Sequence, residues 1–161
     1  MIQGIDLAQE KTRLAAVKFT PREPTAPTQA TPALSEEERL LNEGDNFIAD
    51  GKYNEARAIY KAVLDQFNPQ SERALFGLAV VASNLRKPDS AEEYFRKTLE
   101  VARDLHLVTW SHIYLGRLYD LKGQREEALG QYRAASLTAG AYPDAWRAVQ
   151  RGLQKQFGSR E

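Results

Sequence analysis

Cysteine is absent from this chain of 161 residues. The sequence therefore cannot form disulfides, thiolate metal sites or a cysteine nucleophile. A net charge is lacking too, because 22 Lys and Arg balance 22 Asp and Glu. The general attraction to phosphate backbones on which nucleic-acid binders rely is thus missing. No apolar run is long enough to cross a bilayer, and the N-terminal residues lack a signal-peptide pattern. We expect a soluble protein of undetermined compartment, with no nucleic acid as partner and no membrane insertion.

Motifs that carry catalytic chemistry are equally scarce. The only two histidines, His106 and His112, do not have the i, i+4 spacing that places two metal ligands on one helical face. No phosphate-binding glycine loop and no nucleophile motif occurs. Carboxylate pairs such as Glu126 and Glu127 stand early in expected helices, where the helix dipole favours negative charge. The sequence predicts a protein that is not an enzyme and that holds no metal and no cofactor.

Proline is concentrated in one segment, residues 20–34, which reads TPREPTAPTQATPAL. Proline lacks an amide hydrogen and disfavours helical geometry in the preceding residue, so neither helix nor sheet should run through it. This composition is typical of an extended linker. We expect residues 1–34 to form an N-terminal arm and linker, and residues 35–161 to form the folded domain.

A helical pattern begins at Ser35. Ser35 and Glu38 have the spacing of a capping box, in which each side chain accepts a hydrogen bond from the other residue's backbone amide. Gly51 can end this helix in the left-handed conformation. Beyond it Ala56, Tyr60, Val63 and their neighbours follow the i, i+3, i+4 spacing of a second amphipathic helix. The segment predicts a helical hairpin.

The hairpin pattern recurs along the chain. One set of residues consists of Gly44, Phe47, Gly51, Ala56, Tyr60 and Val63, and a second set with the same mutual spacing consists of Gly116, Tyr119, Gly123, Ala128, Tyr132 and Ala135. A middle copy places Ala79, Ala82, Ala91, Phe95 and Thr98 at the corresponding positions. The period of roughly 34 to 37 residues is that of a tetratricopeptide repeat.

This pattern resembles the tetratricopeptide repeat (TPR) family. The resemblance implies an all-α fold, a right-handed α-α superhelix in which helical hairpins stack as a solenoid. Its repeats would span about 37–70, 72–105 and 109–142. In the family the small residues lie where paired helices cross closely. Two kinds of residue depart from the family pattern. Arg86 and Pro88 replace the turn glycine and the following aromatic residue in the middle repeat. The usual repeat-ending proline is replaced by Asn68, Arg103 and Gly140. We therefore expect irregular turns at residues 84–90 and 103–109.

A capping helix is expected over residues 143–157, because Pro143 suits a first helical position and a solenoid must cover its last hairpin. The spacing places Trp146, Val149, Leu153 and Phe157 on one face. Arg147, Arg151 and Lys155 would then lie on the solvated outer face. A patch for an anionic ligand is the less favoured interpretation of these three cations.

Without catalytic motifs, function should lie on the concave groove that stacked hairpins create. The TPR resemblance implies that the exposed side of each first helix lines this groove. The candidate partner-binding residues are Leu41, Asp45, Ile48, Arg73, Phe76, Val80, Ser83, Trp110, Ile113, Tyr114, Arg117 and Asp120. Aromatic and arginine side chains are the types that concentrate binding energy at interfaces. The alternative is that Phe76, Trp110 and Ile113 fill the solenoid core or contact the N-terminal arm.

One branch of the family binds the C-terminal carboxylate of chaperones through a clamp of lysines, asparagines and an arginine. The corresponding positions hold Leu41, Asp45, Gly77, Trp110 and Tyr114. The sequence therefore predicts a protein that is not of the chaperone carboxylate-clamp type. The groove suits an apolar or aromatic segment with an acidic group near Arg73 or Arg117.

These observations favour a non-catalytic protein-interaction scaffold that binds a peptide or protein segment in the groove. Two alternatives remain open. The chain could be the C-terminal docking or regulatory domain of a larger enzyme, such as a secreted bacterial one, or a structural protein that self-associates.

Overall fold

The computed structural model describes residues 33–159, and every regular element in that range is a helix. The elements are α2 (Glu36–Ala49), α3 (Tyr53–Gln66), α4 (Glu72–Asn84), α5 (Pro88–Val101), α6 (Leu105–Leu121), α7 (Arg125–Ser136), the short 3-10 helix η1 (Ala139–Ala141) and α8 (Pro143–Gln154). The chain divides into two units after Ala33, and the second is described here by itself. The expected arm and linker, residues 1–34, lie almost wholly outside the described residues.

The expected capping box opens α2. The Glu38 amide donates to the Ser35 hydroxyl at 3.2 Å, and the Glu38 carboxylate accepts from the Ser35 amide at 3.0 Å. Two amides that have no partner inside the helix are thereby satisfied. The helix begins where the sequence indicated.

Three hairpin turns share one backbone geometry. Gly51, Arg86 and Gly123 occupy equivalent positions with φ of 72°, 55° and 75°. The residue after each turn donates its amide to a carbonyl five positions back, as Lys87 does to Ala82 at 2.9 Å. The expectation of an irregular turn at residues 84–90 is therefore wrong. Arg86 adopts the left-handed conformation that glycine adopts in the other two turns, although a side chain makes it less favourable.

The expectation of an irregular turn at residues 103–109 is also wrong. The connection is short, because α5 ends at Val101 and α6 is already helical at Leu105. The carboxylate of Asp104 accepts from the His106 amide at 2.8 Å and so caps the start of α6. The Glu72 carboxylate holds the connection against α4, since it accepts from the Arg103 amide at 2.6 Å.

Small residues lie where the paired helices cross. Ala56, Ala91 and Ala128 have no exposed surface. Tyr60 of α3 is buried between Gly44 of α2 and Gly77 of α4, where an added Cβ would overlap its ring on both sides. Tyr132 of α7 is enclosed in the same way by Gly116 and Gly152. Each aromatic ring thus links its own hairpin to the next helix, which confirms a solenoid of stacked hairpins.

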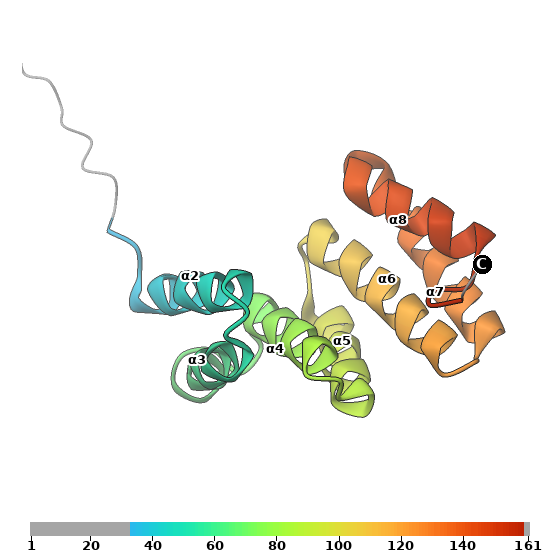
Figure 1. The fold of residues 1–161 in the computed structure, drawn as a ribbon. Helices are drawn as coiled ribbons and strands as arrows, with labels where there is room; N and C mark the ends of the chain where they lie inside the picture. Colours follow the sequence, from blue (N-terminus) through green and yellow to red (C-terminus); the bar gives the residue numbers. More distant parts are fainter. Residues whose placement is uncertain (1–32, 160–161) are drawn as a thin grey trace, which may run out of the picture. The chain divides into compact units, whose positions relative to one another are not determined.

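The described unit has an inner and an outer layer of helices (Figure 1). The first helices α2, α4 and α6 contact one another in succession, and α8 continues the row. Among the described residues, no contact of comparable extent joins α3, α5 and α7 to one another. The row α2, α4, α6 and α8 therefore lines the inner, concave side.

The capping helix ends at Gln154, earlier than expected. Its buried face consists of Ala145, Ala148, Val149 and Gly152. Trp146 was expected on this face, but it is exposed because small residues let α8 approach α7 closely. The chain beyond the helix returns toward α6, where Phe157 lies in a turn instead of continuing the helical face.

Candidate functional site

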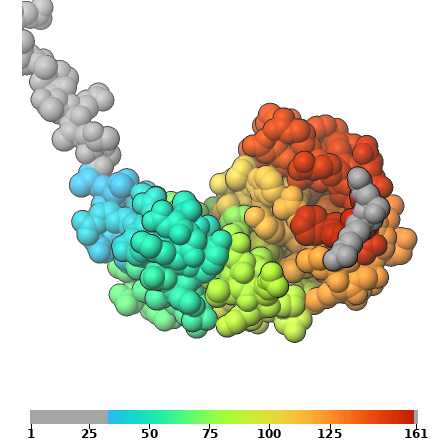
Figure 2. All heavy atoms as spheres, in the orientation of Figure 1, coloured from blue at the N-terminus to red at the C-terminus, as the bar shows by residue number. Residues whose placement is uncertain are grey.

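The concave side contains a hollow of about 340 Å³ between α2, α4 and α6. We call it the apolar hollow. Its lining consists of Asp45, Ile48, Tyr60, Arg73, Phe76, Gly77, Val80, Leu107 and Tyr114. From the predicted set the structure thus brings together Asp45, Ile48, Arg73, Phe76, Val80 and Tyr114. Figure 2 shows an indentation in the surface between the α2–α3 hairpin and the red surface of α8.

Aromatic rings continue from this hollow along α6. Phe76 meets Tyr114 edge-on, with ring centroids 6.2 Å apart, and Trp110 lies 6.0 Å from Tyr114. Beneath them the buried ring of Phe95 stacks on Tyr114 at 5.0 Å. Such contacts hold the rings in fixed orientations. The partly exposed faces of Phe76, Tyr114 and Trp110 form a pre-arranged surface, so these side chains serve both the packing of the repeats and the groove.

Arg73 does not present a free cation. Its guanidinium donates to the Asp45 carboxylate at 2.5 Å and to the Asn42 side-chain oxygen at 3.0 Å. The other oxygen of Asp45 accepts from the Tyr60 hydroxyl at 2.5 Å. Burial and the neighbouring carboxylate raise the pKa of Tyr60. Asp45 and Arg73 therefore neutralise each other at the rim of the apolar hollow.

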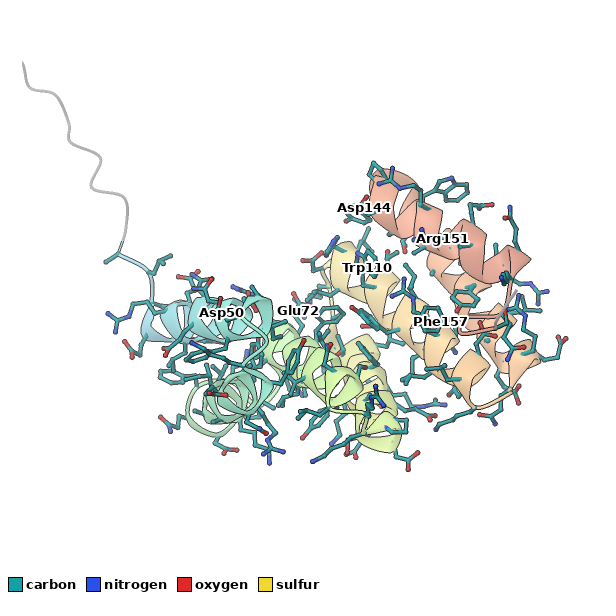
Figure 3. The ribbon with its side chains drawn as sticks, in the orientation of Figure 1. Asp50, Glu72, Trp110, Asp144, Arg151 and Phe157 are labelled. Carbon is teal, nitrogen blue, oxygen red and sulfur yellow. The ribbon has the colours of Figure 1, made fainter. Side chains whose placement is uncertain are left out.

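Arg117 differs from Arg73 in its neighbours. Aromatic rings lie around the guanidinium of Arg117, whereas a carboxylate pairs with that of Arg73. The guanidinium carbon lies 5.2 Å from the ring centroid of Phe157, 5.5 Å from that of Tyr114 and 5.8 Å from that of Trp110. These are cation–π distances. Figure 3 labels Trp110 and Phe157 on the side of α6 that faces α8.

Three predicted site residues are not available to a ligand. Leu41 is 5% exposed and packs in the α2–α3–α4 core, and Ile113 is fully buried against α8. Asp120 is 1% exposed. Their positions on the first helices follow the expected register, but the neighbouring helix or the C-terminal segment covers each of them. Ser83 is half-buried, and its hydroxyl donates to the Ala79 carbonyl at 3.0 Å.

Asp120 instead organises the C-terminal end of the solenoid. Its carboxylate accepts two hydrogen bonds from one nitrogen of Arg125, at 2.9 and 3.0 Å, and one from the Tyr132 hydroxyl at 3.0 Å. It also accepts from the Phe157 amide at 2.8 Å, and its backbone carbonyl accepts from the Gln156 side chain. These bonds join α6, α7 and the segment after α8.

Sequence reasoning missed Arg125, the partner of Asp120. A second nitrogen of Arg125 donates to the Gly152 carbonyl at 2.8 Å and so satisfies an acceptor in the last turn of α8. The one available signal was an acidic residue, Asp120, at the position where the earlier repeats hold Ile48 and Ser83. Nothing in the spacing pointed to Arg125.

The histidines occupy separate environments. His112 shares a hydrogen bond of 2.8 Å with the side-chain oxygen of Gln131, and His106 packs edge-on against Tyr142. Within residues 33–159 no group of three or more His, Cys, Asp or Glu side chains is placed to hold a metal ion. None of the helices described is both long and apolar enough to cross a membrane.

Comparisons with known proteins agree with this architecture. The family model for the tetratricopeptide repeat matches residues 41–104. The crystal structure of PcrH in complex with the chaperone binding region of PopD superposes with a TM-score of 0.62 and 19% identity, covering 76% of this chain and 92% of that chain. A chain of the CopN-Scc3 complex superposes with a TM-score of 0.61 and 19% identity. The match covers 95% of this chain and 88% of that chain. The curated proteins yielded no match.

At 19% identity the two solved structures establish the fold alone. Together with the family match they place the chain in a class, the helical solenoids built from repeated hairpins. The tetratricopeptide repeat model matches the part of the chain that holds the first two hairpins, and the fold of stacked hairpins extends through α8. These comparisons do not support the prediction that the chain is not of the chaperone carboxylate-clamp type.

Proposed function

We propose that this protein is a non-catalytic interaction module that binds a peptide or protein segment in the concave groove formed by α2, α4, α6 and α8. The observation that carries the proposal is the apolar hollow of about 340 Å³ on the concave side. The two solved structures described above are complexes with protein partners, which supports the same proposal.

The hollow has the properties of a peptide-binding surface. It is concave and mainly apolar, with a small number of polar groups at its rim. Phe76 and Tyr114 offer partly exposed ring faces whose orientations are already fixed by packing, so little side-chain entropy is lost on binding. An apolar side chain of a bound segment would enter between Phe76, Ile48 and Val80.

Selection from a displayed library of random peptides on the intact chain tests the proposal. Phe76→Ala and Trp110→Ala should each weaken binding of the selected peptides by about 30-fold or more, because truncating an interface anchor costs about 2 kcal/mol or more. Phe67→Ala and Trp146→Ala are matched controls, since both side chains are exposed and neither lines the hollow nor belongs to the adjoining aromatic surface of Phe76, Tyr114 and Trp110.

Circular dichroism should show unchanged helicity in all four variants, and calorimetry on synthetic copies of the selected peptides measures affinity. Equal affinity for Trp110→Ala and Trp146→Ala would place the binding surface outside the groove. Sedimentation of the intact chain at several concentrations separates peptide binding from the self-association alternative. A groove that is occupied by a second copy should release it when the peptide is added.

A further inference from the structure

A second hollow of about 420 Å³ lies at the C-terminal end of the same concave side, between α6, α8 and the segment after α8. We call it the basic hollow. Arg117 of α6 and Arg151 of α8 reach it, and the segment from Lys155 to Ser159 forms one wall. None of the residues that line it is acidic. Figure 3 labels Arg151 and Phe157 in this region.

Neither Arg117 nor Arg151 has a carboxylate partner among the described residues. By contrast, Arg73 and Arg125 are each paired with an aspartate on a neighbouring turn or helix. A partly buried guanidinium that faces only aromatic rings keeps the N–H groups at its edge available as donors.

Arg151 was expected on the solvated outer face of the cap. Arg151 is indeed exposed, and it also lines the basic hollow, because small residues at Ala148 and Gly152 let α8 pack closely against Tyr132 of α7. The segment after α8 closes the far side of the hollow. Its position is set by the buried carboxylate of Asp120, which accepts from the Phe157 amide. A buried group thus holds the wall of the basic hollow in place, while Arg151 itself is exposed.

The geometry points to a specific ligand chemistry. We propose that the basic hollow binds the side-chain carboxylate of an aspartate or glutamate in the same peptide that fills the apolar hollow, with Arg117 and Arg151 as its partners. This inference rests on the proposed function and adds to it the chemical class of the ligand. Charge complementarity favours it, because two unpaired cations face a hollow with no acidic lining, and arginine matches the planar geometry of a carboxylate.

The spacing of the two hollows along α6 restricts the peptide further. Tyr114 lines the apolar hollow and Arg117 lines the basic hollow. These two residues lie about one helical turn apart on α6, so the two hollows are neighbours. An extended chain advances about 3.3 Å per residue. The apolar and acidic residues of the peptide should therefore stand about two positions apart.

A paired comparison tests this assignment. Peptides selected on the intact chain are synthesised in two forms. One form keeps the Glu or Asp, and in the other that residue is replaced by Gln or Asn. Wild-type protein should prefer the acidic form by about tenfold at low ionic strength, and the preference should shrink in high salt. In Arg117→Gln and in Arg151→Gln the preference should fall below about twofold. Arg133→Gln, which removes an exposed cation from α7 outside both hollows, should keep it.

Each other result overturns the inference. Peptides that bind the groove without acidic preference leave the proposed function intact but remove the carboxylate site. A preference that persists in both arginine variants assigns the anion to another surface. A third test uses peptides whose C-terminus is amidated. If amidation abolishes the preference, the hollow binds a terminal carboxylate and not a side chain. If no selected peptide responds to Trp110→Ala, the proposed function fails and the inference falls with it.

Discussion

Asp120→Asn is the substitution whose effect the structure defines most sharply. The Asp120 side chain has no exposed surface, while its partner Arg125 is 27% exposed. One carboxylate oxygen accepts from Arg125, the Tyr132 hydroxyl and the Phe157 amide, and the other accepts from Arg125 as well. An asparagine keeps one acceptor and replaces the other with an NH2 group, which would face donors. It also leaves Arg125 without its counter-charge.

Breaking a buried ion pair by removing one partner costs about 3 to 5 kcal/mol. For a domain of this size that corresponds to a fall in Tm of roughly 10 to 20 °C. Asp45→Asn is a matched control, because Asp45 also accepts from an arginine and a tyrosine. The Asp45 side chain is 51% exposed and that of Arg73 is 39% exposed. Solvent screens such a pair, so its loss should cost about 0 to 1 kcal/mol.

Thermal and urea unfolding of the two variants, followed by circular dichroism, measures this difference. Hydrogen exchange adds a local readout, because the Phe157 amide should lose protection in Asp120→Asn and keep it in Asp45→Asn. Equal destabilisation by the two substitutions would refute the argument that burial of Asp120 organises the C-terminal end. Unchanged protection of the Phe157 amide would refute its role in holding the segment after α8.

Four further substitutions test the repeat packing and one ion-pair network. Arg86→Gly should stabilise by about 0.5 to 1 kcal/mol in urea unfolding, because relief of the left-handed strain exceeds the added entropy of the unfolded chain; destabilisation would contradict this. Gly116→Ala should destabilise by about 1 to 3 kcal/mol, since its Cβ would stand 2.7 Å from the buried Tyr132 ring, whereas Gly130→Ala on open α7 surface should stabilise slightly. The Lys122 ammonium is the main group that lowers the pKa of Glu92, from 4.5 to about 2. The stability that ionised Glu92 contributes is thus present above about pH 4.5 and is lost as pH falls toward 2, so Glu92→Gln should show a shallower loss of unfolding free energy over that range than wild type.

The repeat pattern predicted the helical elements well, because it depends on local spacing. The apolar periodicity and the capping box located the hairpins to within a few residues, as the start of α2 at Glu36 illustrates. The small residues Ala56 and Ala128 are fully buried at helix crossings, as the TPR resemblance implied. The turn at Arg86 was misjudged, because the helices on both sides impose a backbone conformation that the residue itself does not favour.

The candidate site was predicted in part. Residues such as Phe76 and Tyr114 were placed correctly on the inner side, because the position within a repeat determines which way a side chain on the first helix points. Whether such a side chain is accessible was not predictable from that position. Ile113 is covered by α8, and the charge of Arg73 is neutralised by Asp45 from the preceding repeat.

The sequence by itself determined that this is a solenoid of helical hairpins, since helix formation, turn positions and small crossing residues all follow from interactions within about one repeat. Only the tertiary structure decided which polar residues are buried in ion pairs and which remain without a carboxylate partner. Asp120 became structural because residues 36 and 37 positions further on fold back to it. Arg117 and Arg151 came to share one hollow because α8 packs closely on α7. Such pairings depend on the angle of the last helix and the path of the chain after it, and long-range packing sets both.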